Sequence, residues 1–175
     1  AGVYRHRQLK YPESKDVIRP TKDRIREAFF SSLGDISNKT FLDLYAGVGS
    51  MGIEAISRGV STSYFVDKSE IAIKYIKDNI DNLNIKNAHI IFEEDIKALE
   101  EFKNKNIKFD IIYLDPPYET GKYEEILSYI YSSEILNKGA VVAFEAKRKI
   151  GVNPLWYNKI KEYHYGEITV TVLRN

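Results

Sequence analysis

The stretch FLDLYAGVGSMG at residues 41–52 has the pattern of a short apolar strand, a glycine-rich turn and the start of a helix. Its three glycines have the spacing G-x-G-x-x-G. Gly47 permits a tight turn, Gly49 lets a ligand approach the backbone closely, and Gly52 lets the helix pack against the strand. This order of elements is typical of the first βαβ unit of a nucleotide-binding sheet.

Short strands and helices alternate along the chain that follows this turn. The expected strands are Phe41–Tyr45, Ser63–Asp67, Ala88–Glu93, Phe109–Leu114 and Ala140–Phe144, and the expected helices are Met51–Arg58, Glu70–Asn82, Ile96–Phe102 and Tyr123–Tyr131. This alternation predicts an α/β fold with a mostly parallel sheet. Near the end of the chain, Lys159–Tyr165 and Ile168–Arg174 are expected to form a β-hairpin, so that the sheet also holds an antiparallel strand.

The first 33 residues differ in pattern from the rest. Residues 3–11 alternate loosely and are expected to form a strand or hairpin arm. Thr21 is expected to cap a helix over residues 22–33, which ends at Gly34. We therefore expect a single domain, in which residues 1–33 form a basic arm and helix and residues 34–175 form a Rossmann-like core.

Charge is unevenly distributed, although the chain has 26 Lys+Arg and 25 Asp+Glu in total. Residues 1–33 carry a net charge of +4 and the remaining residues −3. A basic arm favours a polyanionic partner, while a solvated charged surface remains the alternative. Cysteine is absent, which excludes disulfides and cysteine-based zinc sites. The first ten residues lack an apolar segment, and no apolar run is long enough for a membrane span, so we expect a cytoplasmic protein.

Two acidic residues accompany the glycine turn. Asp67 lies 20 residues after Gly47, at the end of the next expected strand, where a carboxylate can accept hydrogen bonds from the hydroxyls of an adenosine ribose. Asp43 lies four residues before Gly47. A carboxylate there is poorly placed beside a pyrophosphate and suits a cofactor with a positive amino-acid end, although it can also accept backbone N–H groups of the turn. The pattern favours S-adenosylmethionine over NAD without excluding NAD.

A buried strand leads directly into Asp115-Pro116-Pro117-Tyr118. Ligands of a parallel α/β sheet bind beyond the carboxyl ends of its strands, so Asp115 is expected at the same edge as Gly47. The Asp115 carboxylate and the Pro116 carbonyl can accept the two hydrogens of an exocyclic amine and aim its lone pair at an electrophilic methyl group. Pro117 keeps the turn rigid, and Tyr118 can stack on the base. The alternative is an ordinary proline-rich turn.

With these motifs the sequence resembles the class I S-adenosylmethionine-dependent methyltransferases that modify exocyclic amines. More narrowly, it is similar to the bacterial small-subunit rRNA guanine-N2 methyltransferases, the RsmD family. The matching segments are AG-x-x-R-x-R-x-L-x-x-P at residues 1–12, RPT-x-DRIRE at 19–27, LDLYAG-x-G-x-x-G-x-EA-x-SRG at 42–59 and DPPY at 115–118.

The resemblance implies a seven-stranded sheet whose C-terminal strand is antiparallel, and it assigns residues to three sets. The catalytic set is Asp115, Pro116, Pro117 and Tyr118; the cofactor set is Asp43, Tyr45, Ala46, Gly47, Gly49, Asp67, Lys68, Asp95 and Ile96; the RNA set is Arg5, Arg7, Lys10, Arg19, Thr21, Arg24 and Arg26. Asp95 would meet the adenine amino group, or alternatively cap the following helix. Arg24 and Arg26 could instead pair with Asp23 and Glu27 on the helix surface.

The implied function is methyl transfer from S-adenosylmethionine to the N2 amine of a guanine in 16S rRNA. The implied enzyme is a monomer without a metal, which acts on free rRNA or on the small-subunit particle. Lys147-Arg148-Lys149 is a second candidate patch for RNA phosphates. The alternatives are methylation of adenine in DNA or RNA or of a glutamine amide, an NAD-dependent oxidoreductase, and a non-catalytic RNA-binding module. An oxidoreductase would leave the tetrad at residues 115–118 unexplained.

Overall fold

The core of the computed structural model, which describes residues 2–4, 7–10, 19–117 and 122–175, is a seven-stranded sheet in the order β3-β2-β1-β4-β5-β7-β6. The strands are β1 (Thr40–Leu44), β2 (Thr62–Asp67), β3 (Ala88–Phe92), β4 (Phe109–Leu114), β5 (Leu136–Ala146), β6 (Lys159–Tyr165) and β7 (Ile168–Arg174). The helices are α1 (Arg19–Leu33), α2 (Ser50–Ser57), α3 (Glu70–Asn82), α4 (Asp95–Asn104) and α5 (Tyr123–Ser132), with short 3-10 turns η1 (Gly2–Tyr4) and η4 (Pro154–Trp156).

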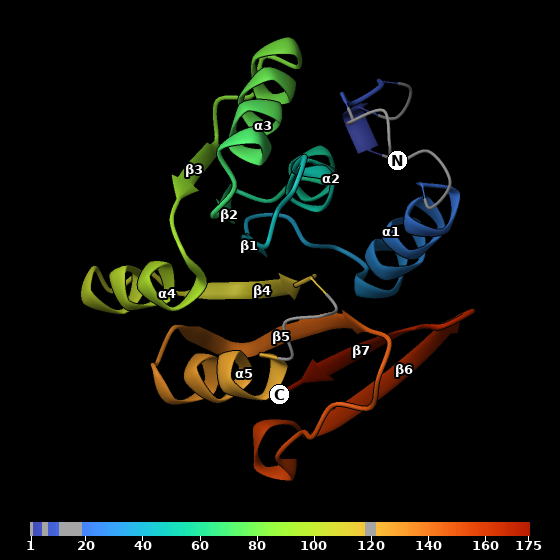
Figure 1. Cartoon of the computed structure of the whole chain (residues 1–175), viewed down its shortest axis with the longest axis vertical. Coiled ribbons are helices and arrows are strands. Elements are labelled where there is room, and N and C mark those ends of the chain that lie inside the picture. Colours follow the sequence, from blue (N-terminus) through green and yellow to red (C-terminus); the bar gives the residue numbers. More distant parts are fainter. Residues whose placement is uncertain (1, 5–6, 11–18, 118–121) are drawn as a thin grey trace.

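Strand direction follows the prediction from the sequence. The first five strands pair in parallel, and β7 pairs antiparallel with both β5 and β6. Figure 1 shows the β6–β7 hairpin at the C-terminal side of the sheet. The predicted mostly parallel, seven-stranded α/β sheet with an antiparallel C-terminal strand is therefore confirmed.

Helices cover both faces of the sheet, because alternate strand residues point to opposite sides. Phe41 and Ile111 belong to the apolar cluster that includes residues of α1, α2 and α3. Their neighbours Leu42 and Ile112 belong to the second cluster, formed with α4 and α5. The two layers are visible in Figure 1. The strands in the middle of the sheet are buried on both faces, which accounts for their near-continuous apolar sequence.

The N-terminal segment differs from the prediction. α1 begins at Arg19, so Thr21 lies inside the helix and is not its N-cap. In the described part of the arm, residues 2–4 form a 3-10 turn and residues 7–10 have no regular structure, so the predicted strand is wrong there. The arm is held by contacts with distant residues instead. The Tyr4 N–H donates to Ser57 Oγ at 2.9 Å, and the Lys10 N–H donates to Asn79 Oδ1 at 2.7 Å.

Within the described ranges, none of the helices combines the length and the apolar character that crossing a lipid bilayer requires.

Gly52 sets how closely α2 packs on the sheet, as the motif predicted. An added Cβ would lie 2.3 Å from Cε2 of the buried Phe65 ring. This distance is too short for a real contact, so the helix or the ring would have to move.

Overpacking a core usually costs about 1–3 kcal/mol, and alanine brings a gain of roughly 1 kcal/mol to a helix interior. We therefore expect Gly52→Ala to lower the free energy of unfolding by up to about 2 kcal/mol. Urea unfolding measures the change. The control is Phe65→Leu alone and combined with Gly52→Ala, because removing ring atoms makes room for the methyl group. A double variant that loses the full sum of the two single losses would contradict the steric explanation.

Candidate active site

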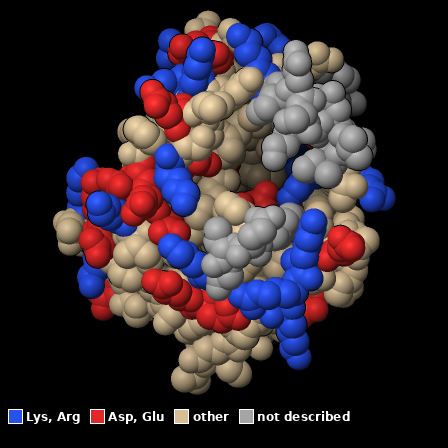
Figure 2. Space-filling view, in the orientation of Figure 1, with Lys and Arg blue, Asp and Glu red and all other residues tan. Residues whose placement is uncertain are grey.

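Acidic side chains gather at the carboxyl ends of neighbouring strands. Asp43 lies in β1, Asp67 ends β2, Asp115 follows β4 and Glu145 lies near the end of β5. Figure 2 shows acidic atoms in a hollow of this face with basic atoms beside them, in the region between α1 and the end of β4. This is the edge at which a parallel α/β sheet binds its ligands.

The glycine turn is held by two of these carboxylates. Asp67 Oδ2 accepts the Gly47 N–H at 2.9 Å, and Asp43 Oδ2 accepts the Gly52 N–H at 2.9 Å. Gly47 and Gly49 have φ of 59° and 85°, values that favour glycine. No atom of the described residues lies within 4 Å of an added Cβ at Gly47, so these residues leave the backbone open to a ligand on that side.

Asp43 has the backbone role that the sequence left as an alternative. It is 2% exposed. Burial raises the pKa of its carboxyl group well above the usual value, the Gly52 N–H opposes this rise, and the nearby charges of Asp115 and Asp67 add to it. Because its carboxyl group accepts the Gly52 N–H at the start of α2, Asp43 stabilises the glycine turn by a hydrogen bond to the backbone.

Asp95 and Tyr45 form a second link at this edge. The Tyr45 hydroxyl donates to Asp95 Oδ2 at 2.8 Å, and burial together with this bond raises the pKa of Tyr45. Asp95 Oδ1 accepts the Ile96 N–H at 2.7 Å. The alternative of Asp95 as a helix cap is wrong, because α4 begins at Asp95 and its N-cap is Glu94.

The other members of the cofactor set lie beside these residues. Ala46 is buried, and its N–H donates to the Val66 carbonyl of β2 at 2.9 Å. Lys68 is exposed and directly follows Asp67, whose Oδ1 accepts the Ser69 N–H at 2.9 Å. The predicted cofactor residues therefore meet around the ends of the first three strands.

Asp115 emerges from the end of β4 as predicted. Its N–H donates to the Leu44 carbonyl at 3.4 Å, which places it beside the end of β1. Its side chain is 31% exposed. Pro116 is buried, Pro117 is exposed, and Tyr118 lies outside the described residues.

Three residues that the sequence analysis did not select contact this site. Lys22 Nζ of α1 lies 3.2 Å from Asp115 Oδ2 and 2.5 Å from Glu145 Oε1. The Tyr113 hydroxyl donates to Glu145 Oε2 at 2.5 Å. The signal for Lys22 was its position seven residues before Phe29, since two helical turns place both on one face.

Asn79 is another residue that the sequence analysis missed. It is 2% exposed, and its amide group donates to the carbonyl of Val48 in the glycine turn at 3.1 Å. The same side chain accepts the Lys10 N–H at 2.7 Å. One buried amide therefore joins the N-terminal arm to the candidate cofactor loop.

The predicted RNA set divides into residues with different surroundings. Arg7 and Lys10 are exposed on the arm, and Thr21 is half-buried in α1. The Arg24 guanidinium lies 5.9 Å from the centre of the Tyr165 ring. Arg5 and the side chain of Arg19 lie outside the described residues.

Arg26 forms the ion pair with Asp23 that the sequence analysis gave as the alternative to RNA binding. Its guanidinium lies 3.2 Å from Asp23 Oδ1 and 3.6 Å from Glu54 Oε1. In the second candidate patch, Arg148 forms two hydrogen bonds with Glu124, at 3.0 and 2.9 Å. These carboxylates neutralise part of the positive charge that the sequence analysis assigned to RNA.

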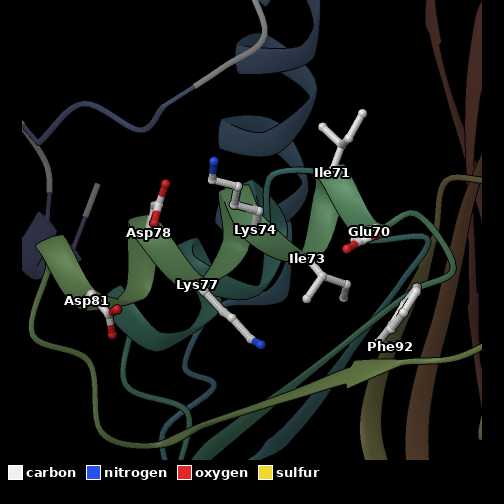
Figure 3. A pocket seen from close by; sticks show the side chains of 8 residues that line it. All are labelled: Glu70, Ile71, Ile73, Lys74, Lys77, Asp78, Asp81 and Phe92. Carbon is white, nitrogen blue, oxygen red and sulfur yellow. The ribbon is translucent and has the colours of Figure 1, made fainter.

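A groove of about 690 Å³ is lined by residues of α3 and by Phe92 at the end of β3. Figure 3 shows Ile73 and Phe92 near one end of this stretch of α3, Asp81 at the other end, and Lys77 between them. Among the described residues, none that was assigned to catalysis, cofactor or RNA lines this groove. The candidate active site is therefore the edge that carries Asp67 and Asp115.

The strand order of the sheet is that of the class I methyltransferases, and a solved structure of a putative methyltransferase from Escherichia coli has a TM-score of 0.86 at 25% identity, covering 100% of this chain and 95% of that one. The chain belongs to the family described as conserved hypothetical protein 95, whose sequence profile matches residues 1–174. The resemblance to the RsmD family is confirmed.

Named relatives match most of the chain. A protein of Buchnera aphidicola subsp. Acyrthosiphon pisum named ribosomal RNA small subunit methyltransferase D is 35% identical over 133 residues, covering 75% of this chain and 69% of the relative. A Haemophilus influenzae protein of the same name is 28% identical over 179 residues, covering 100% and 92%. A solved structure of a hypothetical protein from Thermus thermophilus has a TM-score of 0.84 at 25% identity, covering 100% and 97%.

We expect Asp43→Asn to gain stability relative to the wild type as the pH rises. The raised pKa means that the folded wild type keeps a proton that the unfolded chain has released, so its stability falls with pH above the unfolded value of about 4. Asparagine does not ionise in this range, and its amide oxygen can still accept the Gly52 N–H. Urea unfolding at several pH values from about 4 to 8 measures the difference.

The matched control is Asp35→Asn. Asp35 is exposed, and hydrogen bonds from Ser37 lower its pKa, so the wild type gains stability as the pH rises through the acid range. This change has the opposite sign to that at Asp43 and lies below the unfolded value of about 4, so from about pH 4 to 8 the effect of Asp35→Asn on stability should stay nearly constant. A stability difference at position 43 that does not change with pH would show that Asp43 carries no burial penalty.

Proposed function

We propose that this chain transfers a methyl group from S-adenosylmethionine to the exocyclic N2 amine of a guanine in 16S rRNA. The observation that carries the proposal is the position of Asp115 at the end of β4, beside the end of β1, directly before a buried proline. The names of the Buchnera and Haemophilus relatives support the RNA substrate.

The amine of a base is a weak nucleophile, because its lone pair is delocalised into the ring. The Asp115 carboxylate and the Pro116 carbonyl accept hydrogen bonds from the two N–H groups of the amine. These bonds draw the nitrogen toward tetrahedral geometry and fix the direction of its lone pair. Orientation of this kind can supply several kcal/mol of the barrier. Tyr118, the last residue of the tetrad, supplies an aromatic face for the base.

The residues at the glycine turn fit S-adenosylmethionine. The backbone is open at Gly47, and the Asp67 carboxylate at the end of β2 can accept hydrogen bonds from ribose hydroxyls. Asp95 lies at the start of α4, with Ile96 beside it for the adenine ring. When bound, this cofactor supplies an electrophilic methyl group on a positively charged sulfur.

The N-terminal arm is the proposed contact for RNA phosphates. Arg7 and Lys10 are exposed, and both lie in the segment with the net positive charge. Arg5 and Arg19 add to that charge in the sequence. The protein acts as a monomer, on free rRNA or on the assembled small-subunit particle.

We expect Asp67→Ala to weaken S-adenosylmethionine binding by about 1–3 kcal/mol, the range for losing hydrogen bonds to a charged acceptor. Isothermal titration measures the dissociation constant. Asp67→Asn keeps an acceptor for the Gly47 N–H and separates loop support from ribose binding. Asp81→Ala, an exposed acid on the far end of α3, is the control and should bind like the wild type. Unchanged affinity in Asp67→Ala would remove Asp67 from the ribose role.

We expect Asp115→Ala to lose methyl transfer by on the order of a hundredfold or more, because the amine loses its charged acceptor. Asp115→Asn keeps one acceptor oxygen and should retain partial activity. The assay is single-turnover transfer of a tritiated methyl group to small-subunit particles and to free rRNA from cells that lack this protein, followed by nucleoside analysis.

The control for this series is the affinity for S-adenosylmethionine, which the Asp115 variants should keep. Full transfer by Asp115→Ala would place the chemistry elsewhere. A methylated adenine or glutamine in place of N2-methylguanine would overturn the substrate and leave amine methylation standing.

A further inference from the structure

The candidate active site contains an ion-pair network that has no role in the proposed reaction as described so far. Lys22 Nζ contacts Glu145 Oε1 at 2.5 Å and Asp115 Oδ2 at 3.2 Å, and it therefore bridges two carboxylates. We propose that Lys22 is a positioning residue, which is anchored on Glu145 and holds the Asp115 carboxylate charged and in place for the target amine. This inference rests on the proposed function.

The register of the sheet explains why these groups meet. β1, β4 and β5 pair so that Asp43 lies beside Tyr113 and Tyr113 beside Ala143. Side chains two residues apart on a strand share a face, so Asp115 and Glu145 are directed to the same side as Tyr113. This is the side that α1 covers, because Phe29 of α1 packs edge-on against the Tyr113 ring at a centroid distance of 4.9 Å.

The packing of α1 against the sheet also determines where the Lys22 side chain lies. Lys22 and Phe29 lie two helical turns apart on one face of α1. Phe29 is 3% exposed, so it fixes the helix to the sheet, and the same face brings the ammonium group of Lys22 to the strand ends. The Lys22 side chain is 26% exposed, partly withdrawn from water.

The Glu145 side chain is held in place by burial and by hydrogen bonds. It is 3% exposed, and Lys22 and Tyr113 each donate to one of its carboxylate oxygens. The Tyr123 hydroxyl donates to its backbone carbonyl at 2.6 Å. A buried carboxylate is costly unless it is paired with a cation, so Lys22 satisfies a requirement that Glu145 creates.

Acidic side chains at three other strand ends belong to the same site as Asp115. Asp43 of β1, Asp67 of β2 and Glu145 of β5 are acidic. Among the residues that the structure describes, the hydroxyl groups of Tyr113 and Tyr123 also lie at this site, and the ammonium group of Lys22 contacts Asp115. Carboxylates in one another's field resist ionisation, and a cation within hydrogen-bond distance restores it.

Lys22 leaves room for the substrate on the carboxylate that it positions. Its ammonium group is closer to Glu145 than to Asp115, where the distances to the two oxygens are 3.2 and 3.5 Å. An ionised carboxylate offers about four lone pairs, so Asp115 can accept from Lys22 and from the target amine together. Because the charges of Lys22 and Glu145 cancel, the negative charge of Asp115 is left to face the amine.

The test compares Lys22→Met with Lys22→Arg over a range from about pH 5 to about pH 9. The first readout is single-turnover methyl transfer, and the second is the carbon-13 chemical shift of the Asp115 carboxyl group, which Asp115→Asn identifies. Without the cation the Asp115 pKa rises, so in Lys22→Met the acid limb of the rate and the carboxyl titration should both move up by about one pH unit or more. Lys22→Arg keeps the charge and should follow the wild type.

If Lys22→Met does not fold, the double variant Lys22→Met/Glu145→Gln keeps the test possible, because it removes the buried charge of Glu145 together with its partner. Its titration should return toward that of the wild type. If the carboxyl titration is the same in Lys22→Met, the double variant and the wild type, the inference is wrong, whatever the enzyme methylates. If the carboxyl titration shifts in Lys22→Met but the wild type transfers no methyl group to rRNA, the proposed function alone is overturned.

Discussion

Two carboxylates on neighbouring strands hold the turn between β1 and α2 by its backbone. Gly49 is the N-cap of α2 and has no side chain to offer, so the free N–H groups of the first helical turn need another acceptor. Asp43 supplies it from the strand below, and Asp67 binds the turn from the side. The position of the turn, the close packing of α2 and the opening at Gly47 all depend on these bonds.

Most of the core was predictable from the sequence, because its pattern is local. Short apolar strands such as Phe109–Leu114 could be identified without tertiary information, and the glycine spacing fixed the first turn. The end of the sheet required only the hairpin pattern at Gly166. The candidate site followed from one rule, that residues after parallel strands meet at one edge, and this rule placed Asp67 and Asp115 correctly.

The parts that sequence analysis missed depend on contacts between distant segments. The arm was predicted as a strand, but its backbone is held by the side chains of Ser57 and Asn79, which no local pattern indicates. Lys22 stands in a charged run that suggests a solvated surface, yet the helix turns it toward Glu145. The resemblance assigned Arg26 to RNA, with an ion pair on the helix surface as the alternative; in the structure it pairs with Asp23 and also with Glu54 of α2, which no local pattern indicates.

The strand order leaves β3 and β6 at the two open edges of the sheet. An edge strand exposes unpaired backbone groups, onto which a strand of another molecule can add. Along β6 the first four residues are exposed, and three of them are charged: Lys159, Lys161 and Glu162. Bringing a second strand beside this row would crowd and desolvate those charges, so β6 protects the sheet from edge-to-edge aggregation while it completes the hairpin.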